Sequence, residues 1–495
     1  MKLSDLLKIL PEYNSTAPEV EVLSVTDDAR QVHLSAVFVA VPGSQTDGHQ
    51  FLPQACEAGA IAVIVERAEQ VPKDYQGYVQ VVGSSRQALN RLALNLYDDP
   101  SKSLFCFGVT GTNGKTSFTY MLEAIFSKAR IPCGVLGTIN HHLGDKIWPS
   151  GLTTPGAIEL QKRLREMKDE GARAVALEVS SHALDQHRAD GVQFNTVVFT
   201  NLTRDHLDYH KKMEDYFLAK QKLFTDVLWK SQKLPRFAIV NTDDSWGAKL
   251  RVAGAAAIWS YGKNSAADFR YKILSVDFLR TDFELKTPAG VYKSSIPMCG
   301  NHNVANAVAA VAAAASVGVK PSVSLQALSR FDGVPGRLQV VPNFKSLNVF
   351  VDYAHTPDAL ENVLKSLQEI RDQSKAHSKI WTIFGCGGDR DHGKRLLMAE
   401  KAMVHSDCVM VTSDNPRSED PYAIIHQIMD GFSIDERKNK VLMEVDRRKA
   451  IEKVLKSAKP HDVVLIAGKG HEDYQIIGKE RNFFSDYETA KEFLR

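Results

Sequence analysis

A glycine-rich run that contains a lysine and a threonine is the strongest chemical signal in the sequence. It reads Gly111-Thr112-Asn113-Gly114-Lys115-Thr116-Ser117 and separates an apolar run at 104–109 from an amphipathic stretch at 116–129. The N–H groups of such a loop and the positive end of the following helix can surround a polyphosphate, while the lysine neutralises its oxygens and the threonine binds Mg²⁺. Val109 stands where the strict Walker spacing requires glycine, so a glycine-rich packing turn is the alternative. We predict a nucleoside triphosphate site.

Two groups of acidic and histidine residues follow further apolar runs. Glu178-Val-Ser-Ser-His182 ends the run at 172–179, and Asn201-Leu-Thr-Arg-Asp-His206-Leu-Asp-Tyr-His210 follows the run at 196–200. Open α/β sheets bind ligands at the carboxyl ends of their strands, and Mg²⁺ prefers oxygen ligands. A single histidine there is more often a surface group, but two such groups in one nucleotide-binding domain favour a cation and phosphate site. We therefore expect Glu178 to bind Mg²⁺.

Lys220 is a further candidate, although its local pattern is weak. It lies in a helix-like run, 216–224, whose apolar residues do not form one clean stripe. Residue types alone favour a solvated lysine at this position. Only a family resemblance indicates a chemical role.

The elements that would position these residues alternate between strands and helices. After the phosphate loop we predict helices at 116–129 and 158–168 and strands at 133–139, 172–179, 196–200 and 237–240. Strands that alternate with helices of this length are typical of crossover units and a mostly parallel sheet. Between 269 and 297 the apolar period changes to two, which indicates an added antiparallel ribbon.

Turn-rich segments divide the chain into three predicted domains. Asp98-Asp99-Pro100-Ser101 ends a small α/β domain, 1–98, and Gly333-Val-Pro-Gly-Arg337 ends a central domain, 99–334. Apolar runs alternate with helical stretches again in 335–495, which predicts a Rossmann-like doubly wound sheet. The predicted fold class is α/β, with a central P-loop parallel-sheet domain that carries the ribbon and a smaller α/β domain before it.

Size and composition exclude several classes of protein. The 495 residues leave room for about three domains, and 44% apolar with 24% charged residues excludes a mainly disordered chain. A formal charge of +2 gives no field that would attract nucleic acid or a membrane surface. Six scattered cysteines indicate a reducing compartment, and no apolar stretch is long enough to cross a bilayer. We expect a cytoplasmic protein with no nucleic-acid partner and no membrane insertion.

Six motifs together resemble the Mur ligases of bacterial cell-wall synthesis, in order and spacing across nearly the whole chain. They stand at 111–116, 178–182, 201–206, 300–303, 335–337 and 352–355. The resemblance implies an ATP-dependent ligase that joins an acid to an amino acid in peptidoglycan precursor synthesis. In such a reaction a carboxylate attacks the γ-phosphate, and an amine then displaces phosphate from the acyl phosphate.

The resemblance also implies roles at the nucleotide site, with Lys115, His206 and Lys220 in catalysis. Thr116 and Glu178 would bind one Mg²⁺, and His206 would help to bind a second. Lys220 resembles a lysine that CO₂ carboxylates, which would make it an anionic oxygen ligand for Mg²⁺. ATP would contact two domains, so that closure would complete its site. The implied ATP-binding residues are Gly111, Thr112, Asn113, Gly114, Lys115, Thr116, Ser117, Asn303, Arg337, Asp352 and His355.

Three further motifs, at 384–391, 414–417 and 468–475, resemble the family member that adds meso-2,6-diaminopimelate to UDP-N-acetylmuramoyl-L-alanyl-D-glutamate. Forked arginine donors would bind the carboxylates of diaminopimelate, and Glu472 would accept from its distal ammonium. Relatives that add L-lysine lack the arginine at position 417. Exposed loop arginines with solvated charges are the alternative. The implied diaminopimelate-binding residues are Arg390, Asp414, Asn415, Pro416, Arg417, Gly468 and Glu472.

The implied contacts to the UDP-sugar dipeptide come from the first two domains. Ala29 and Leu152 depart from the family pattern, where serine and asparagine occur, and Ala29 removes a hydroxyl that would contact the uracil. The implied residues are Ser44, Gln45, Thr46, Thr153, Thr154, Ser180, Gln186 and Arg188.

Three other functions remain open from the sequence. An L-lysine-adding ligase would differ mainly in its amino-acid pocket. A ligase similar to folylpolyglutamate synthase should lack the N-terminal domain and the Asp-Asn-Pro-Arg motif, and a non-catalytic nucleotide-binding switch would have no need for Arg417 and Glu472. We expect a monomer that uses ATP and Mg²⁺.

Overall fold

The computed structural model describes residues 1–14, 16–43, 46–373 and 378–495, so Ser44 and Gln45 lie outside the described residues. The chain forms two compact units. One comprises 1–270, 287–289 and 308–324, and the other comprises 271–286, 290–307 and 325–495. In the described part of the chain, no helix combines the length and the hydropathy that a bilayer crossing requires.

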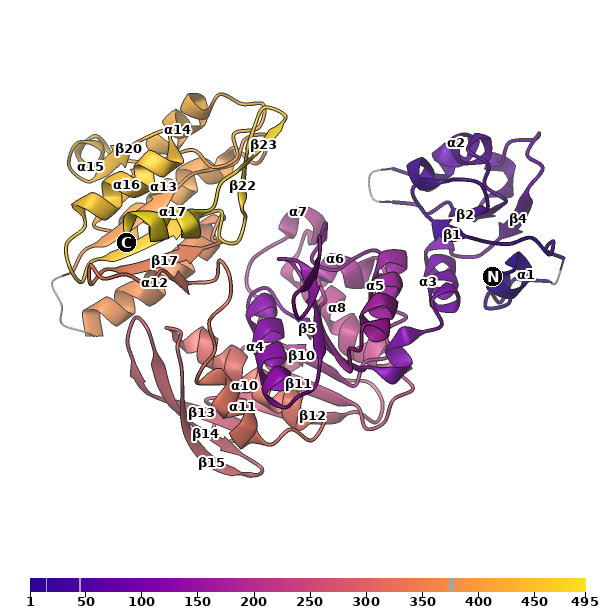
Figure 1. Ribbon diagram of the computed structural model, residues 1–495, viewed down its shortest axis with the longest axis horizontal. Helices are drawn as coiled ribbons and strands as arrows, with labels where there is room; N and C mark the ends of the chain where they lie inside the picture. Colours follow the sequence, from indigo (N-terminus) through magenta and orange to yellow (C-terminus); the bar gives the residue numbers. More distant parts are fainter. Residues whose placement is uncertain (15, 44–45, 374–377) are drawn as a thin grey trace. The chain divides into compact units, whose positions relative to one another are not determined.

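The N-terminal part of the first unit is a four-stranded parallel sheet in the order β1-β2-β3-β4 (Figure 1). Every residue of β2 and β3 is buried, as expected for parallel strands that are covered on both faces. The elements are α1 (Leu3–Leu7), β1 (Ser24–Thr26), β2 (Ala36–Val39), α2 (Leu52–Glu57), β3 (Ala62–Val65), β4 (Tyr78–Val81) and α3 (Ser85–Leu96).

A larger sheet follows, with parallel strands in the order β12-β11-β10-β5-β9-β6. β7 and β8 form a hairpin that pairs antiparallel with β6. The elements are β5 (Phe105–Thr110), α4 (Lys115–Lys128), β6 (Cys133–Leu136), β7 (His141–Leu143), β8 (Lys146–Trp148), α5 (Ala157–Asp169), β9 (Ala174–Glu178), α6 (Ser181–Asp185), β10 (Thr196–Phe199), α7 (Leu207–His210), α8 (Met213–Lys222), α9 (Leu228–Lys230), β11 (Phe237–Asn241) and β12 (Ala257–Gly262).

Helices cover both faces of this sheet because side chains along each strand alternate in direction. Phe107 of β5 packs on Phe126 of α4, with ring centroids 5.2 Å apart. Cys106, which precedes Phe107 in β5, packs instead in the apolar cluster that contains Leu160 and Leu164 of α5. Because β5, β9 and β10 are parallel neighbours, their carboxyl ends lie at one edge of the sheet.

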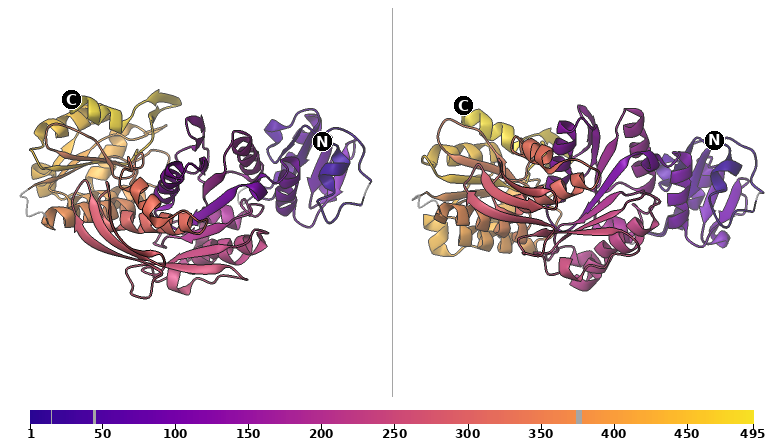
Figure 2. Two further views of the ribbon diagram at one scale, coloured as in Figure 1. Left: turned by 60° about the horizontal axis from the view of Figure 1, so that its bottom comes forward. Right: turned by 90° about the horizontal axis from the view of Figure 1, so that it is seen from below.

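Three long strands, β13 (Phe269–Val276), β14 (Thr281–Thr287) and β15 (Gly290–Ile296), are neighbours in chain order and lie side by side in Figure 2. Only residues 288–289 separate β14 from β15. Connections this short join antiparallel strands, so the ribbon predicted between 269 and 297 is present. Two helices, α10 (Asn301–Ala315) and α11 (Pro321–Leu328), follow.

The C-terminal part of the second unit is a doubly wound sheet in the order β16-β17-β21-β18-β19-β20, parallel except at β16. Val463 and Leu465 of β21 pack in one apolar cluster with α12, α13 and α14, whereas Val464 and Ile466 pack in another with α16 and α17. The elements are β16 (Gln339–Val340), β17 (Asn348–Asp352), α12 (Pro357–Gln373), β18 (Ile380–Phe384), α13 (Gly393–His405), β19 (Cys408–Val411), α14 (Pro421–Met429), α15 (Ile434–Asn439), β20 (Val441–Met443), α16 (Arg447–Ser457), β21 (Val463–Ala467), β22 (Tyr474–Ile477), β23 (Glu480–Phe483) and α17 (Asp486–Phe493). The predicted Rossmann-like sheet is confirmed.

Candidate active site

The glycine-rich loop lies between β5 and α4, as the sequence predicts. Gly114 precedes the first residue of α4 in the left-handed conformation (φ +87°), and Lys115 begins the helix. The Lys115 Nζ donates to the carbonyls of Gly111 and Thr112, at 2.8 Å each, so its ammonium lies over the loop. Thr116 is buried in the first turn, where the free N–H groups of the helix favour an anion.

The segment after β10 holds this loop in place. The Thr200 hydroxyl donates to the Asn113 carbonyl at 2.6 Å. The Asn201 side chain accepts from the Asn113 N–H at 2.9 Å, and its carbonyl accepts from the Thr112 N–H at 2.9 Å. The sequence shows Asn201 within a motif, but it gives no sign that Thr200 and Asn201 fix the phosphate loop.

We expect Gly111→Ala to damage both folding and nucleotide binding. A Cβ at this position would lie 1.9 Å from the Thr200 Oγ1 and 3.1 Å from the backbone of Asn201, so the loop and the segment that holds it must separate. We expect a loss of about 1–3 kcal/mol in the free energy of unfolding and a weakening of ATP binding by about tenfold or more. Thermal unfolding and calorimetric titration measure the two effects.

Gly83→Ala is the matched control, because its Cβ would meet only ordinary contact, 3.7 Å from a Glu12 oxygen. Equal behaviour of the two variants would show that the close approach at Gly111 is unimportant.

Lys220 projects from α8 onto the same loop and is 1% exposed. Its Nζ donates to the Gly111 carbonyl at 2.9 Å, which also accepts from Lys115, and lies 4.4 Å from the centre of the Tyr216 ring. Burial, and then the neighbouring Lys115 charge, lower the pKa of Lys220 well below its ordinary value. The solvated-lysine interpretation is therefore wrong, and the chain holds a buried amine beside the phosphate loop.

Histidine and tyrosine rings surround this region. The His206 ring centroid lies 4.9 Å from that of His182 and 5.9 Å from that of Tyr216. The Tyr216 hydroxyl lies 3.2 Å from the Thr112 hydroxyl. His206 therefore belongs to the same group of side chains as the loop and Lys220.

Glu178 ends β9 and is 1% exposed, beside β5 in the sheet. Its two carboxylate oxygens accept from the Thr138 N–H and hydroxyl, at 3.0 Å each. A carboxylate has about four acceptor positions, so Glu178 keeps capacity for a cation. Over residues 1–14, 16–43, 46–373 and 378–495, no three His, Cys, Asp or Glu side chains form a ready-made metal cage. Mg²⁺ in nucleotide enzymes typically uses one or two carboxylates with phosphate and water oxygens, a pattern that Thr116 and Glu178 fit.

The residues implied for the dipeptide lie together near Glu178. The Thr154 hydroxyl donates to the Glu178 carbonyl at 2.8 Å and accepts from the Ser180 N–H at 3.0 Å, and its carbonyl accepts from Arg188 at 3.1 Å. Arg188 also donates to the Gln186 amide oxygen at 3.0 Å, and the Thr153 and Thr138 hydroxyls lie 3.1 Å apart. Thr46 is in the N-terminal sheet domain, where its carbonyl accepts from the Gly43 N–H at 2.9 Å.

Four residues implied for ATP lie in the second unit. The Asp352 carboxylate is buried and accepts from the N–H groups of Leu338 and Ala354, at 2.7 and 2.9 Å; burial raises its pKa. The Arg337 guanidinium lies 4.9 Å from the Tyr353 ring centre. His355 lies three residues after the end of β17, and its Nδ1 is 2.8 Å from the Tyr353 carbonyl. The Asn303 amide donates to the Cys299 carbonyl at 2.8 Å.

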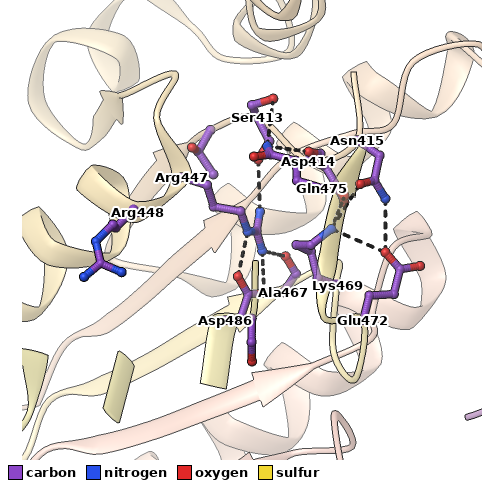
Figure 3. A network of polar contacts seen from close by, with 12 residues as sticks. Ser413, Asp414, Asn415, Arg447, Arg448, Ala467, Lys469, Glu472, Gln475 and Asp486 are labelled. Carbon is purple, nitrogen blue, oxygen red and sulfur yellow. Dashed lines mark hydrogen bonds and ion pairs between the residues drawn. The ribbon is translucent and has the colours of Figure 1, made fainter. Parts of the chain in front are cut away.

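The residues implied for diaminopimelate follow β18, β19 and β21 of the doubly wound sheet. The Asn415 amide donates to Glu472 at 3.0 Å, and the Arg417 Nη1 donates to the Gly388 carbonyl at 2.7 Å (Figure 3 for Asn415 and Glu472). The backbone of Ile476 binds both Asn415 and Arg417. Its N–H donates to the Asn415 side chain at 3.0 Å, and its carbonyl accepts from the Arg417 N–H at 3.1 Å.

The other members of this set lie close to Gly387, to Gly468 or in one loop. A Cβ on Gly387 would lie 2.9 Å from the Arg417 Nη1 and 3.9 Å from the Arg390 Cγ, so both arginines border it. Gly468 has φ +115°, and a Cβ on it would lie 2.9 Å from the Asp414 Oδ2. Pro416 lies in the same loop as Asp414 and Arg417. Arg390 is exposed and Arg417 half-buried.

Sequence reasoning missed two cations here, Lys469 and Arg447. Lys469 lies within the Gly-Lys-Gly-His-Glu run and is fully buried, in contact with Asn415 and Glu472. Arg447 is also fully buried and forms a paired contact with Asp486, at 2.7 Å for both bonds. One sign in the sequence indicates that Lys469 belongs to this group, because Lys469 stands only three residues before Glu472.

The chain is similar to known proteins along nearly its whole length. Family models match three segments: "Mur ligase family, catalytic domain" at 21–96, "Mur ligase middle domain" at 109–314 and "Mur ligase, glutamate ligase domain" at 336–470. A Geobacter metallireducens protein named UDP-N-acetylmuramoyl-L-alanyl-D-glutamate–2,6-diaminopimelate ligase is 42% identical over 100% of this chain and 98% of its own length. A protein of the same name from Aquifex aeolicus is 42% identical over 96% and 94%.

Solved structures give the same result. A structure titled as that ligase is 32% identical, with a TM-score of 0.71, over 100% of this chain and 99% of its own. A Mycobacterium tuberculosis folylpolyglutamate synthase shares the fold at 17% identity, with a TM-score of 0.61 over 77% of this chain and 92% of its own. The α/β fold, the phosphate loop and the full-length matches lead to one conclusion: this chain belongs to the Mur ligase family.

Proposed function

We propose that this chain is the ATP-dependent ligase that joins meso-diaminopimelate to the γ-carboxylate of D-glutamate in UDP-N-acetylmuramoyl-L-alanyl-D-glutamate. The product is a peptidoglycan precursor. Its relatives of about 40% identity carry this activity in their names. The proposal also includes a monomer in the cytoplasm that uses Mg²⁺.

The single observation that carries the choice of amino acid is Arg417 beside the Asn415–Glu472 pair. Diaminopimelate ends in a group that holds both a carboxylate and an ammonium, whereas L-lysine ends in an ammonium alone. The Arg417 guanidinium uses one donor on Gly388 and keeps others for a carboxylate, while the Glu472 carboxylate can accept from the ammonium. Asp414, Pro416, Gly468 and Arg390 complete the proposed pocket.

The reaction needs an activated carboxylate, because a free carboxylate is a poor acyl donor. A carboxylate oxygen attacks the γ-phosphorus of ATP and ADP leaves; the substrate amine then attacks the acyl carbon, and phosphate leaves with that oxygen while the amine loses a proton. Lys115 over the loop neutralises the transferring phosphoryl group, and the N–H groups of the first turn of α4 orient it. Bound Mg²⁺, held through Thr116, Glu178 and His206, would supply further charge neutralisation.

Lys220 gains a chemical role in this proposal. Its lowered pKa favours the neutral amine, which is the form that attacks CO₂; the new N–C bond releases a proton and leaves a carbamate. The carbamate places an anion beside the Lys115 ammonium. This accounts for a lysine that is buried within reach of another lysine, an arrangement that is otherwise unfavourable.

The proposal also assigns substrate contacts to two other sets of residues. Thr153, Thr154, Ser180, Gln186 and Arg188 would bind the dipeptide end of the nucleotide substrate, with Ser44, Gln45 and Thr46 near its uridine. Asn303, Arg337, Asp352 and His355 would contact ATP.

Phosphate release by the purified full chain tests the proposal against its alternatives. We expect release with ATP, Mg²⁺, the UDP-sugar dipeptide and meso-diaminopimelate, and little when L-lysine replaces diaminopimelate. Equal release with L-lysine would contradict the specificity. Release with a folate and glutamate would indicate a folylpolyglutamate synthase, and ATP binding without release under any condition would indicate a nucleotide-binding switch.

A further inference from the structure

Lys469 is a buried cation in the middle of the proposed amino-acid pocket. It follows β21, and its side chain is 0% exposed. Its Nζ donates to the Asn415 Oδ1 at 3.1 Å and lies 3.4 Å from the Glu472 Oε2 and 3.6 Å from the Asp414 Oδ1 (Figure 3). A charge this deeply buried is retained only where its partners are well placed, and all three partners belong to the proposed pocket.

Lys469 is one of three groups that fix which way the Asn415 amide points. The Asn415 oxygen accepts from Lys469 and from the Ile476 N–H at 3.0 Å, and its NH₂ donates to Glu472 at 3.0 Å. If the amide turned over, its NH₂ would face two donors and its oxygen would face a carboxylate. Lys469 and the Asn415 NH₂ thereby contact the same Glu472 oxygen, Oε2.

Lys469 also separates two carboxylates. Asp414 and Glu472 both lie within 3.6 Å of the same ammonium. Without that charge the two carboxylates would repel each other, and Glu472 would move away from Asp414. A displaced Glu472 would no longer meet the distal ammonium, so the pocket would lose its preference for the distal amine.

A rigid frame surrounds this group. The Arg447 guanidinium donates to the Ala467 carbonyl at 2.9 Å and the Ser413 carbonyl at 3.4 Å, which directly precede Gly468 and Asp414, and it is held by Asp486 (Figure 3). Arg447 thus fixes the two strand ends, whereas Lys469 acts within the pocket that they carry. Removal of Lys469 should therefore affect side-chain positions more than the fold.

Resting on the proposed function, we infer that Lys469 is a positioning residue for the amino-acid substrate: together with the Ile476 N–H it orients Asn415, and it holds Glu472 in place beside Asp414, so that Glu472 binds the distal ammonium.

Lys469→Met tests this inference in the full chain. We expect the apparent KM for diaminopimelate to rise about 30-fold or more, while those for ATP and the UDP-sugar dipeptide stay within about threefold of the parent values. Lys479→Met is the matched control, since Lys479 is exposed between β22 and β23, and should change nothing. An unchanged KM for diaminopimelate, or an equal rise for all three substrates, would overturn the inference.

A double-mutant cycle tests whether Lys469 acts through Glu472. If it does, Lys469→Met combined with Glu472→Gln should raise the KM little more than Glu472→Gln alone, because both changes remove one interaction. If the KM increases of the two single variants multiply in the double variant, Lys469 does not act through Glu472. Should Lys469→Met not fold, Lys469→Gln replaces it in the same cycle. The unsubstituted chain separates the two claims: failure to use diaminopimelate rejects the proposed function, whereas use of diaminopimelate with an indifferent Lys469 rejects only the inference.

Discussion

Replacing Lys220 with alanine is expected to reduce turnover by about 10³-fold or more, with partial recovery on addition of a short-chain carboxylate such as formate or acetate. The side chain is buried on the phosphate loop, where its Nζ lies 2.9 Å from the Gly111 carbonyl, and alanine has no amine that CO₂ could carboxylate. Truncation leaves a space beside Lys115 that a small carboxylate can enter, which restores the negative charge of a carbamate. Steady-state phosphate release with and without the added acid measures both effects.

Lys222→Ala is the control for this experiment, because it removes a lysine from the same helix. Its side chain is about one-third exposed, and its ammonium donates to Asp185 at 2.8 Å and not to the loop. We expect it to keep most of the activity. A nearly normal rate for Lys220→Ala would remove Lys220 from the mechanism, and an inactive variant that no carboxylate restores would contradict its carboxylation.

Replacing Arg417 with alanine is expected to raise the apparent KM for diaminopimelate about 100-fold, which is about 2.7 kcal/mol, and to leave the KM for ATP within about threefold. The forked guanidinium would lose its paired bonds to the distal carboxylate, which a shorter side chain cannot make. Kinetics with each substrate varied in turn measure the difference. The KM for L-lysine should change little, so the preference for diaminopimelate should nearly disappear.

Two features of position 417 set the controls. Its backbone is in the left-handed region (φ +53°), but arginine and alanine both carry a Cβ there, so the substitution adds no backbone strain and thermal unfolding should change little. Arg448→Ala is the matched variant, because Arg448 is exposed, pairs with Glu492 and lies outside the pocket (Figure 3 for Arg448). A uniform rise in every KM for Arg417→Ala would indicate misfolding and contradict a specific role.

Much of the fold could be predicted because strands and helices alternate clearly. The strands at 105–110, 174–178 and 196–199 were each expected within a few residues, since fully buried parallel strands appear as continuous apolar runs. The hairpin of β7 and β8 was not predicted. Its strands have three residues each and carry polar side chains, so they have little apolar pattern.

The site could be predicted only in part, because motifs identify residue types and not their surroundings. Glycine, lysine and threonine in sequence marked the phosphate loop. The burial of Lys220 could not be read from its helix, since it depends on Tyr216 and on a loop more than a hundred residues away. The bonds from Thr138 to Glu178 and from Lys469 to Asn415 likewise join distant segments, which only tertiary packing brings together.

The transfer of oxygen from substrate to phosphate tests the central claim most directly. With both oxygens of the D-glutamate γ-carboxylate labelled with ¹⁸O, the acyl-phosphate route leaves one label in the new amide and moves the other to inorganic phosphate. Mass spectrometry of the phosphate released with diaminopimelate should therefore find one ¹⁸O atom in each molecule. Unlabelled phosphate released alongside the amide product would show that the carboxylate is never phosphorylated, and would contradict the account.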